Sequence, residues 1–199
     1  TTMPDFGILA SGYSSKHGIT RNPWNPKCNP GGSSSGAAAS IAAGINPIAV
    51  GTDIVGSIRL PASFCGLAGM KPSQYRVPYY FPNSPALVAG PMARTVADAA
   101  LLMTVISEPD SRDFTAMRYD PLPYRHLDAE PVRQRIGFLP ALGWERTRDA
   151  AVKAAVEAAA RHFESVGHDV VAVKPPFSVG EDEPAADFYR VRTLTELDR

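Results

Sequence analysis

The chain has 199 residues, of which 44% are hydrophobic and 20% are charged, a composition typical of a globular protein with about one domain. Its 20 Lys and Arg residues balance its 20 Asp and Glu residues, which argues against a nucleic-acid partner. No apolar stretch reaches the roughly 18 residues of a membrane-spanning helix, so we expect no membrane partner.

The cysteines, Cys28 and Cys65, lack the paired spacing of a zinc site. Because the N-terminus shows no export signal, we expect both thiols to be reduced and the protein to be cytoplasmic.

The first half of the chain combines Gly- and Ser-rich loops with short regular elements. Residues 36–44 are rich in alanine and predict a helix of small side chains, and residues 47–51 predict a short buried strand. Residues 95–107 have helical periodicity, and Thr95 is placed as the N-cap of a capping box. We interpret residues 1–107 as the part of the chain that carries its two loops.

The second half begins with residues 108–134, which are rich in Pro, Asp and Arg and predict a surface connection. Residues 135–199 then hold a strand, a helix, a second strand and a terminal helix, predicted at residues 135–139, 148–166, 168–173 and 184–199. A strand, helix and strand of this length predict a right-handed crossover between parallel strands. Apolar residues recur every three or four positions along the middle helix, at Val152, Val156, Ala159, Phe163 and Val166.

These elements together predict an α/β fold with a twisted mixed β-sheet flanked by helices on both faces. The crossover unit supplies parallel strands, and the predicted helices supply the layers that cover a sheet.

Two Gly/Ser loops, at residues 31–36 and 51–57, could each present backbone N–H groups to an anion. Both have the glycine spacing of a phosphate-binding loop. However, Ala37 and Ser57 stand where that loop requires its lysine, which disfavours nucleotide binding. The sequence also lacks a G-x-S-x-G nucleophile elbow, and none of its four histidines lies in a recognisable triad motif.

The loop sequences GGSSSGAAASIAAG and GTDIVGSIRLPASFCGLAGMKPS resemble the signature of the amidase signature family, which runs G-G-S-S-G-G and then G-T-D-x-G-G-S-I-R-x-P. The resemblance extends upstream through RNPWNP and downstream through GPMARTVADAALL. It implies that residues 1–199 form part of a single amidase domain with a partial amidase signature fold, in which residues 1–107 are the signature core.

The resemblance implies an amide hydrolase with a Ser, cis-Ser, Lys triad and with no metal or cofactor. The nucleophile maps onto Ser57, and the bridging cis-serine maps onto Ser33. The oxyanion hole consists of backbone N–H groups, at Ile54, Val55, Gly56 and Ser57. Further motif positions support the two loops, at Gly32, Ser34, Asp53 and Arg59.

The two loops can meet in space, because the helix from Gly36 leads away from the first loop and the strand from Ile48 returns toward the second. A nine-residue helix and a four-residue strand both span about 13 Å. We therefore expect the hydroxyls of Ser33 and Ser57 to lie within hydrogen-bond distance of each other.

The sequence departs from the family pattern at Val55 and Ser35, which both replace glycines. The family's catalytic lysine lies several tens of residues before the bridging serine. Lys16 and Lys27 are too close to Ser33, and Lys71 follows the nucleophile. We therefore expect the chain to be an internal piece of a longer amidase, and expect these 199 residues alone to be inactive.

The implied reaction hydrolyses a carboxylic amide to an acid and ammonia or an amine through a seryl acyl-enzyme. The implied partner is a small-molecule amide, and association into a homo-oligomer is left open. Two alternatives remain. One is a glutaminase subunit of a tRNA-dependent amidotransferase, and the other is a catalytically incomplete scaffold or binding module on the amidase fold.

Overall fold

The structure is a computed structural model, and it describes residues 1–80, 86–120, 124, 127, 132–140, 149–175, 187 and 191. The chain divides into two compact units, residues 1–129 and residues 130–199.

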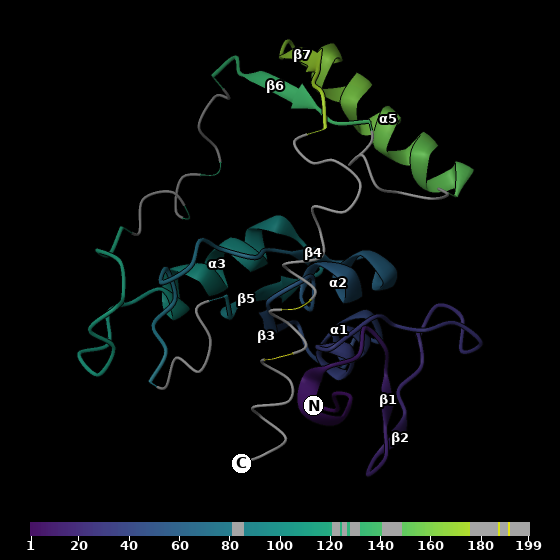
Figure 1. Cartoon of the computed structure of the whole chain (residues 1–199), viewed down its shortest axis with the longest axis vertical. Coiled ribbons are helices and arrows are strands. Elements are labelled where there is room, and N and C mark those ends of the chain that lie inside the picture. Colours follow the sequence, from purple (N-terminus) through teal and green to yellow (C-terminus); the bar gives the residue numbers. More distant parts are fainter. Residues whose placement is uncertain are drawn as a thin grey trace. The chain divides into compact units, whose positions relative to one another are not determined.

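The first unit is built around a small antiparallel sheet with the strand order β3-β5-β4, and β1 and β2 form a separate antiparallel pair (Figure 1). The elements in chain order are η1 (Asp5–Gly7), β1 (Tyr13–Ser14), β2 (Gly18–Ile19), α1 (Ser35–Ala42), β3 (Ile48–Asp53), α2 (Arg59–Cys65), β4 (Ala68–Gly69), β5 (Val88–Ala93) and α3 (Val96–Ile106). In Figure 1, α3 lies alongside β5, and the two elements are in contact.

The predicted small-residue helix is confirmed as α1, and the helix predicted at residues 95–107 is confirmed as α3. Thr95 caps α3, because its hydroxyl accepts a hydrogen bond from the Asp98 N–H at 3.1 Å. The strand predicted at residues 47–51 is present as β3, which continues to Asp53 because it stays paired with β5 over its whole length.

Two elements of the first unit were not predicted from the sequence. Strand β5 contains Gly90 and Pro91, which disfavour a strand, yet all six of its residues are buried. Helix α2 contains Pro61, which is tolerated because it lies in the first turn, where an N–H group has no helical partner. Gly66 ends α2 in the left-handed conformation, with φ of 68°.

Small side chains allow α1, α2 and the sheet to pack closely. The core cluster comprises Ala37, Ala38, Ile41, Ile58, Ala62, Cys65 and Met92. Because Ile58 follows Ser57 directly and is fully buried, this core fixes the backbone on one side of the proposed nucleophile.

A loop far away in the sequence caps the end of α2. The side-chain amide of Asn22 donates to the Phe64 carbonyl at 2.8 Å, and the indole N–H of Trp24 donates to the Cys65 carbonyl at 2.8 Å. These carbonyls lie in the last turn of α2, where a helix leaves its C=O groups without partners. The RNPWNP segment thus anchors α2 at its C-terminal end.

The second unit confirms the predicted crossover. Its elements are β6 (Arg135–Phe138), α5 (Ala150–Ser165) and β7 (Asp169–Ala172), and β6 pairs with β7 in parallel. Asp149 caps α5 by accepting hydrogen bonds from two N–H groups of its first turn. The helix predicted at residues 184–199 falls outside the described residues except for positions 187 and 191.

The α/β class is confirmed, but a continuous mixed sheet is not found among the described strands, which form three small sheets. The predicted apolar face of α5 is also exposed within its unit, at Val152, Val156, Phe163 and Val166. The reason is geometric, because two four-residue strands are too short to cover a helix of 16 residues. None of the helices in the described part of the chain is both long and apolar enough to cross a membrane.

We predict that Gly90→Ala destabilises the protein by about 1 to 3 kcal/mol, the usual cost of overpacking. A Cβ at Gly90 would lie 2.2 Å from the Met70 carbonyl oxygen, which is a backbone atom. The free energy of unfolding in urea measures the effect. Gly137→Ala on β6 is the control, since its Cβ would meet only the Val173 side chain, at 3.2 Å and beyond. Equal stability of both variants would contradict the prediction.

Candidate active site

The two Gly/Ser loops lie against each other, as the sequence predicts. The Ser34 N–H donates to the Ser57 carbonyl at 3.2 Å. The Ser34 hydroxyl accepts from the Thr52 N–H at 3.2 Å and donates to the Thr52 carbonyl at 3.4 Å. Ser34 therefore joins the first loop both to the open edge of β3 and to the residue that carries the proposed nucleophile.

The peptide bond between Gly32 and Ser33 is cis, the geometry that the amidase signature implies. A side chain at Gly32 would collide with the backbone of Ser11, 2.5 Å from its nitrogen and oxygen. Ser33 is buried and Ser57 is half-buried. No side-chain hydrogen bond joins these two serines among the described residues, so a proton relay needs a side-chain rotation that brings the hydroxyls together.

Asp53 is fully buried at the end of β3 and binds the backbone on both sides of Ser57. Its carboxylate accepts from the Gly56 N–H at 2.7 Å and from the Ile58 N–H at 3.2 Å. Arg59 donates to the same carboxylate through Nε and Nη2, each at 3.0 Å. This bidentate pair and the two amide bonds fix the loop that presents Ser57.

Opposing effects act on the pKa of Asp53. Burial raises the pKa, but the hydrogen bonds from Arg59, Gly56 and Ile58 outweigh it, and the net pKa lies below the ordinary value. Asp53 is therefore ionised at neutral pH, as its bidentate contact with a guanidinium requires.

The Gly56 amide is engaged by Asp53, so the structure does not leave it free for an oxyanion as the sequence analysis expects. Gly56 has φ of 128°, a conformation that favours glycine. The N–H groups of Ile54, Val55 and Ser57 have no acceptor within the described part of the chain. These three amides remain available to stabilise negative charge.

A cavity of about 160 Å³ opens beside Ser33, and its lining includes Ser34, Thr2, Val50 and Thr52. No lysine among the described residues donates a hydrogen bond to either candidate serine, and Lys71 instead donates to the Pro72 carbonyl at 2.9 Å.

A structural contact at α1 escaped the sequence analysis. The Thr2 carbonyl accepts hydrogen bonds from the Gly36 N–H at 2.9 Å and from the Ser35 hydroxyl at 3.4 Å. A Cβ at Gly36 would lie 2.5 Å from the Thr2 nitrogen. The acceptor is a backbone group, so residue type gave no signal of it, although the glycine was consistent with a close approach.

The remaining nucleophile candidates are less suited to catalysis. Cys65 is buried, its Sγ donates to the Pro30 carbonyl at 3.5 Å, and burial raises the pKa of its thiol. In the second unit, Nδ1 of His168 accepts from the Gln134 N–H at 3.1 Å. Across the described residues, no group of three His, Cys, Asp or Glu side chains could hold a metal ion.

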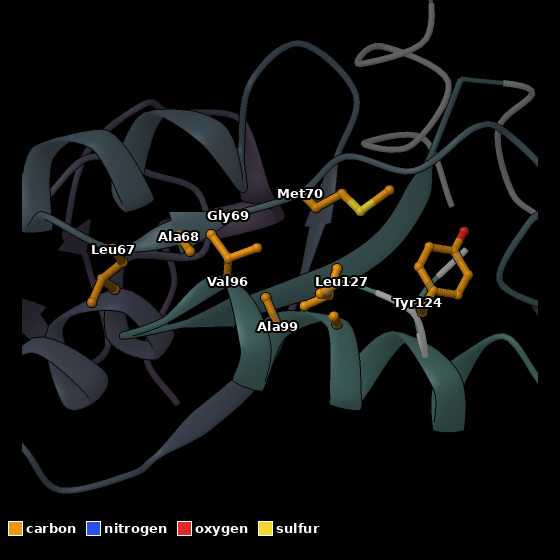
Figure 2. Close-up of a pocket in the computed structure, with 9 residues that line it drawn as sticks. Leu67, Ala68, Gly69, Met70, Val96, Ala99, Tyr124 and Leu127 are labelled. Atoms are coloured by element: carbon orange, nitrogen blue, oxygen red, sulfur yellow. The ribbon is translucent and has the colours of Figure 1, made fainter. Parts of the chain in front are cut away.

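A larger pocket of about 660 Å³ lies between β4 and the start of α3 (Figure 2). Its walls are apolar, and the lining residues include Leu67, Met70, Val96, Ala99 and Leu127. None of the candidate catalytic serines lines this pocket.

Comparison with known proteins places the chain in a family. A model of the amidase family matches residues 1–182. The chain belongs to the amidase signature family. It is 42% identical, over 185 residues, to the amidase-family subunit of the glutamyl-tRNA(Gln) amidotransferase of Chromohalobacter salexigens, with 88% of this chain and 37% of that protein covered.

Two solved amidase signature structures show the same fold. A bacterial aryl acylamidase superposes with a TM-score of 0.81 at 34% identity, covering 94% of this chain and 39% of that one. The 6-aminohexanoate cyclic dimer hydrolase, complexed with substrate, superposes with a TM-score of 0.77 at 32% identity, covering 87% and 38%. The chain thus spans a little over a third of the length of these relatives.

We predict that Asp53→Asn destabilises the protein by about 3 kcal/mol, because the amide cannot neutralise Arg59 and its NH₂ group faces other donors. Urea unfolding of the variant measures the loss. Asp110→Asn is the matched control, since Asp110 also binds an arginine through both carboxylate oxygens but lies at the surface. A control effect as large as that of Asp53→Asn would contradict the prediction.

The lowered pKa of Asp53 also predicts a pH dependence. Its contribution to stability is complete above the unfolded-state pKa of about 3.9 and is lost as the pH falls through the lower folded-state pKa. Unfolding measured between pH 7 and pH 2 should therefore show a smaller acid-induced loss of stability in Asp53→Asn than in the unmodified protein. Identical pH profiles would contradict this assignment.

Proposed function

We propose that the protein hydrolyses a carboxylic amide through a seryl acyl-enzyme, with Ser57 as the nucleophile. The observation that carries the proposal is the meeting of the two signature loops, with Ser57 held between the amides that bind Asp53. Attack of Oγ on the amide carbon forms a C–O bond and then breaks the C–N bond. Water cleaves the resulting ester to release the acid.

Ser33 acts as the bridge for the proton that Ser57 loses. A serine hydroxyl is a weak nucleophile until an adjacent base removes its proton. Ser33 passes the proton to a lysine, following the family mechanism, and the same route returns it to the leaving ammonia or amine. The cavity beside Ser33 offers a place for that base.

The tetrahedral intermediate carries negative charge on the former carbonyl oxygen. The amides of Ile54, Val55 and Ser57 stabilise it, since each is available while that of Gly56 binds Asp53. Such donors are effective because they are already oriented before the charge develops. Asp53 and Arg59 hold this loop without contacting the substrate.

A second candidate substrate is glutamine, hydrolysed to supply ammonia to an amidotransferase. The observation that favours it is the 42% identity to the amidotransferase subunit of Chromohalobacter salexigens. The same serine chemistry serves both candidates, and the difference lies in the amide that is bound.

Labelling with an activated fluorophosphonate tests the nucleophile in the full-length gene product. We predict that the reagent modifies Ser57, that Ser57→Ala abolishes labelling, and that Ser33→Ala slows it by about 10² to 10⁴-fold through loss of base assistance. Ser63→Ala is the control, because Ser63 is an exposed serine on α2 only six positions away.

Mass spectrometry of the labelled peptide locates the modified residue. Labelling that persists unchanged in Ser57→Ala would refute the nucleophile. Labelling that is equally fast in Ser33→Ala would refute the bridge and favour a scaffold that lacks the relay.

A further inference from the structure

Two large apolar side chains flank the loop of the proposed oxyanion hole. Val55 lies within that loop and is 66% exposed, and Leu60 is 36% exposed on the first turn of α2. A Cβ at Gly56 would lie 3.1 Å from Cγ and Cδ1 of Leu60, which shows that the leucine covers this glycine. The proposed reaction centre is thus bordered by hydrocarbon.

The apolar surface continues along α2. Phe64 lies one helical turn beyond Leu60 and is 49% exposed, and Trp24 is 72% exposed next to the end of the helix. The indole N–H of Trp24 is satisfied by the Cys65 carbonyl, so the remainder of its ring is free for apolar contact. We call Val55, Leu60, Phe64 and Trp24 the apolar wall.

The charge on α2 does not reach beyond its own ion pair. Arg59 is the one charged residue in the helix, and its guanidinium is held by both oxygens of Asp53. Glutamine carries an ammonium and a carboxylate in addition to its amide, and the wall offers neither group a partner. An aryl or alkyl group needs no such partner and gains from contact with hydrocarbon.

We propose that the apolar wall binds an aryl or alkyl group attached to the amide, with Val55 and Leu60 as specificity-determining residues. This inference rests on the proposed function, because the wall matters through its position next to Ser57. It separates the two candidate substrates, favouring an aryl or alkyl amide over glutamine. The similarity to an aryl acylamidase is in keeping with this choice.

The test compares kcat/KM for acetanilide, acetamide and glutamine in the full-length gene product. Burying one leucine side chain against a ligand corresponds to about a 10- to 100-fold gain in affinity. We therefore expect Leu60→Asn to lower kcat/KM for acetanilide about 10-fold or more while changing that for acetamide less than about 3-fold. Val55→Gly should lower the same ratio.

Leu101→Asn is the matched control, because Leu101 is also a helical leucine and is 63% exposed, on α3. Its substitution should leave the ratio of acetanilide to acetamide unchanged. Thermal unfolding of each variant accompanies the kinetics and separates an effect on binding from an effect on folding.

Several outcomes would overturn the inference. Equal losses for acetanilide and acetamide in Leu60→Asn would show that the leucine only positions the loop. Preference of the unmodified protein for glutamine would assign the site to the polar amide. A lower unfolding temperature in Leu60→Asn, with an unchanged substrate ratio, would show that the wall is covered by protein. Absence of fluorophosphonate labelling at Ser57 would instead refute the proposed function itself.

Discussion

The buried carboxylate of Asp53 is the constraint on which the rest of the site depends. It ends β3 and binds the amides of Gly56 and Ile58, one on each side of Ser57. It also neutralises Arg59, the first residue of α2. A strand, a loop and a helix are thereby held by one side chain, and the orientation of the Ser57 backbone follows from it. Because a buried carboxylate is stable only with such partners, the ion pair and the loop geometry support each other.

The packing around this centre is built from small residues. Alanines of α1 and α2 bring the two helices close enough for Ile58 and Met92 to fill the space between them. The glycine at position 36 admits the backbone of Thr2, which supplies acceptors at the start of α1. Larger side chains would separate the first loop from the second, and Ser34 could then no longer reach both β3 and Ser57.

Local patterns explain which elements could be predicted. Helices α1, α3 and α5 have suitable composition or periodicity, with a cap at Thr95 or a glycine after the last turn, and the parallel pairing of β6 and β7 follows from the length of the crossover. Strand β5 is central but contains Gly90 and Pro91, so its strand conformation depends on tertiary pairing. The meeting of the two loops could also be predicted, since it follows from the lengths of the helix and strand between them. The commitment of the Gly56 amide to Asp53 could not, because it depends on where a buried side chain points.

Helix α2 is restrained at both ends, by Asp53 at its first residue and by Asn22 and Trp24 at its last turn. The restraint has an entropic consequence for whatever contacts this helix. A side chain that is free in solution loses rotamer freedom when a ligand orders it, which typically costs about 0.5 to 1.5 kcal/mol. The Trp24 indole is already immobilised by its bond to the Cys65 carbonyl. A molecule that stacks on this ring therefore meets a preorganised surface, and it retains more of the free energy of contact as affinity.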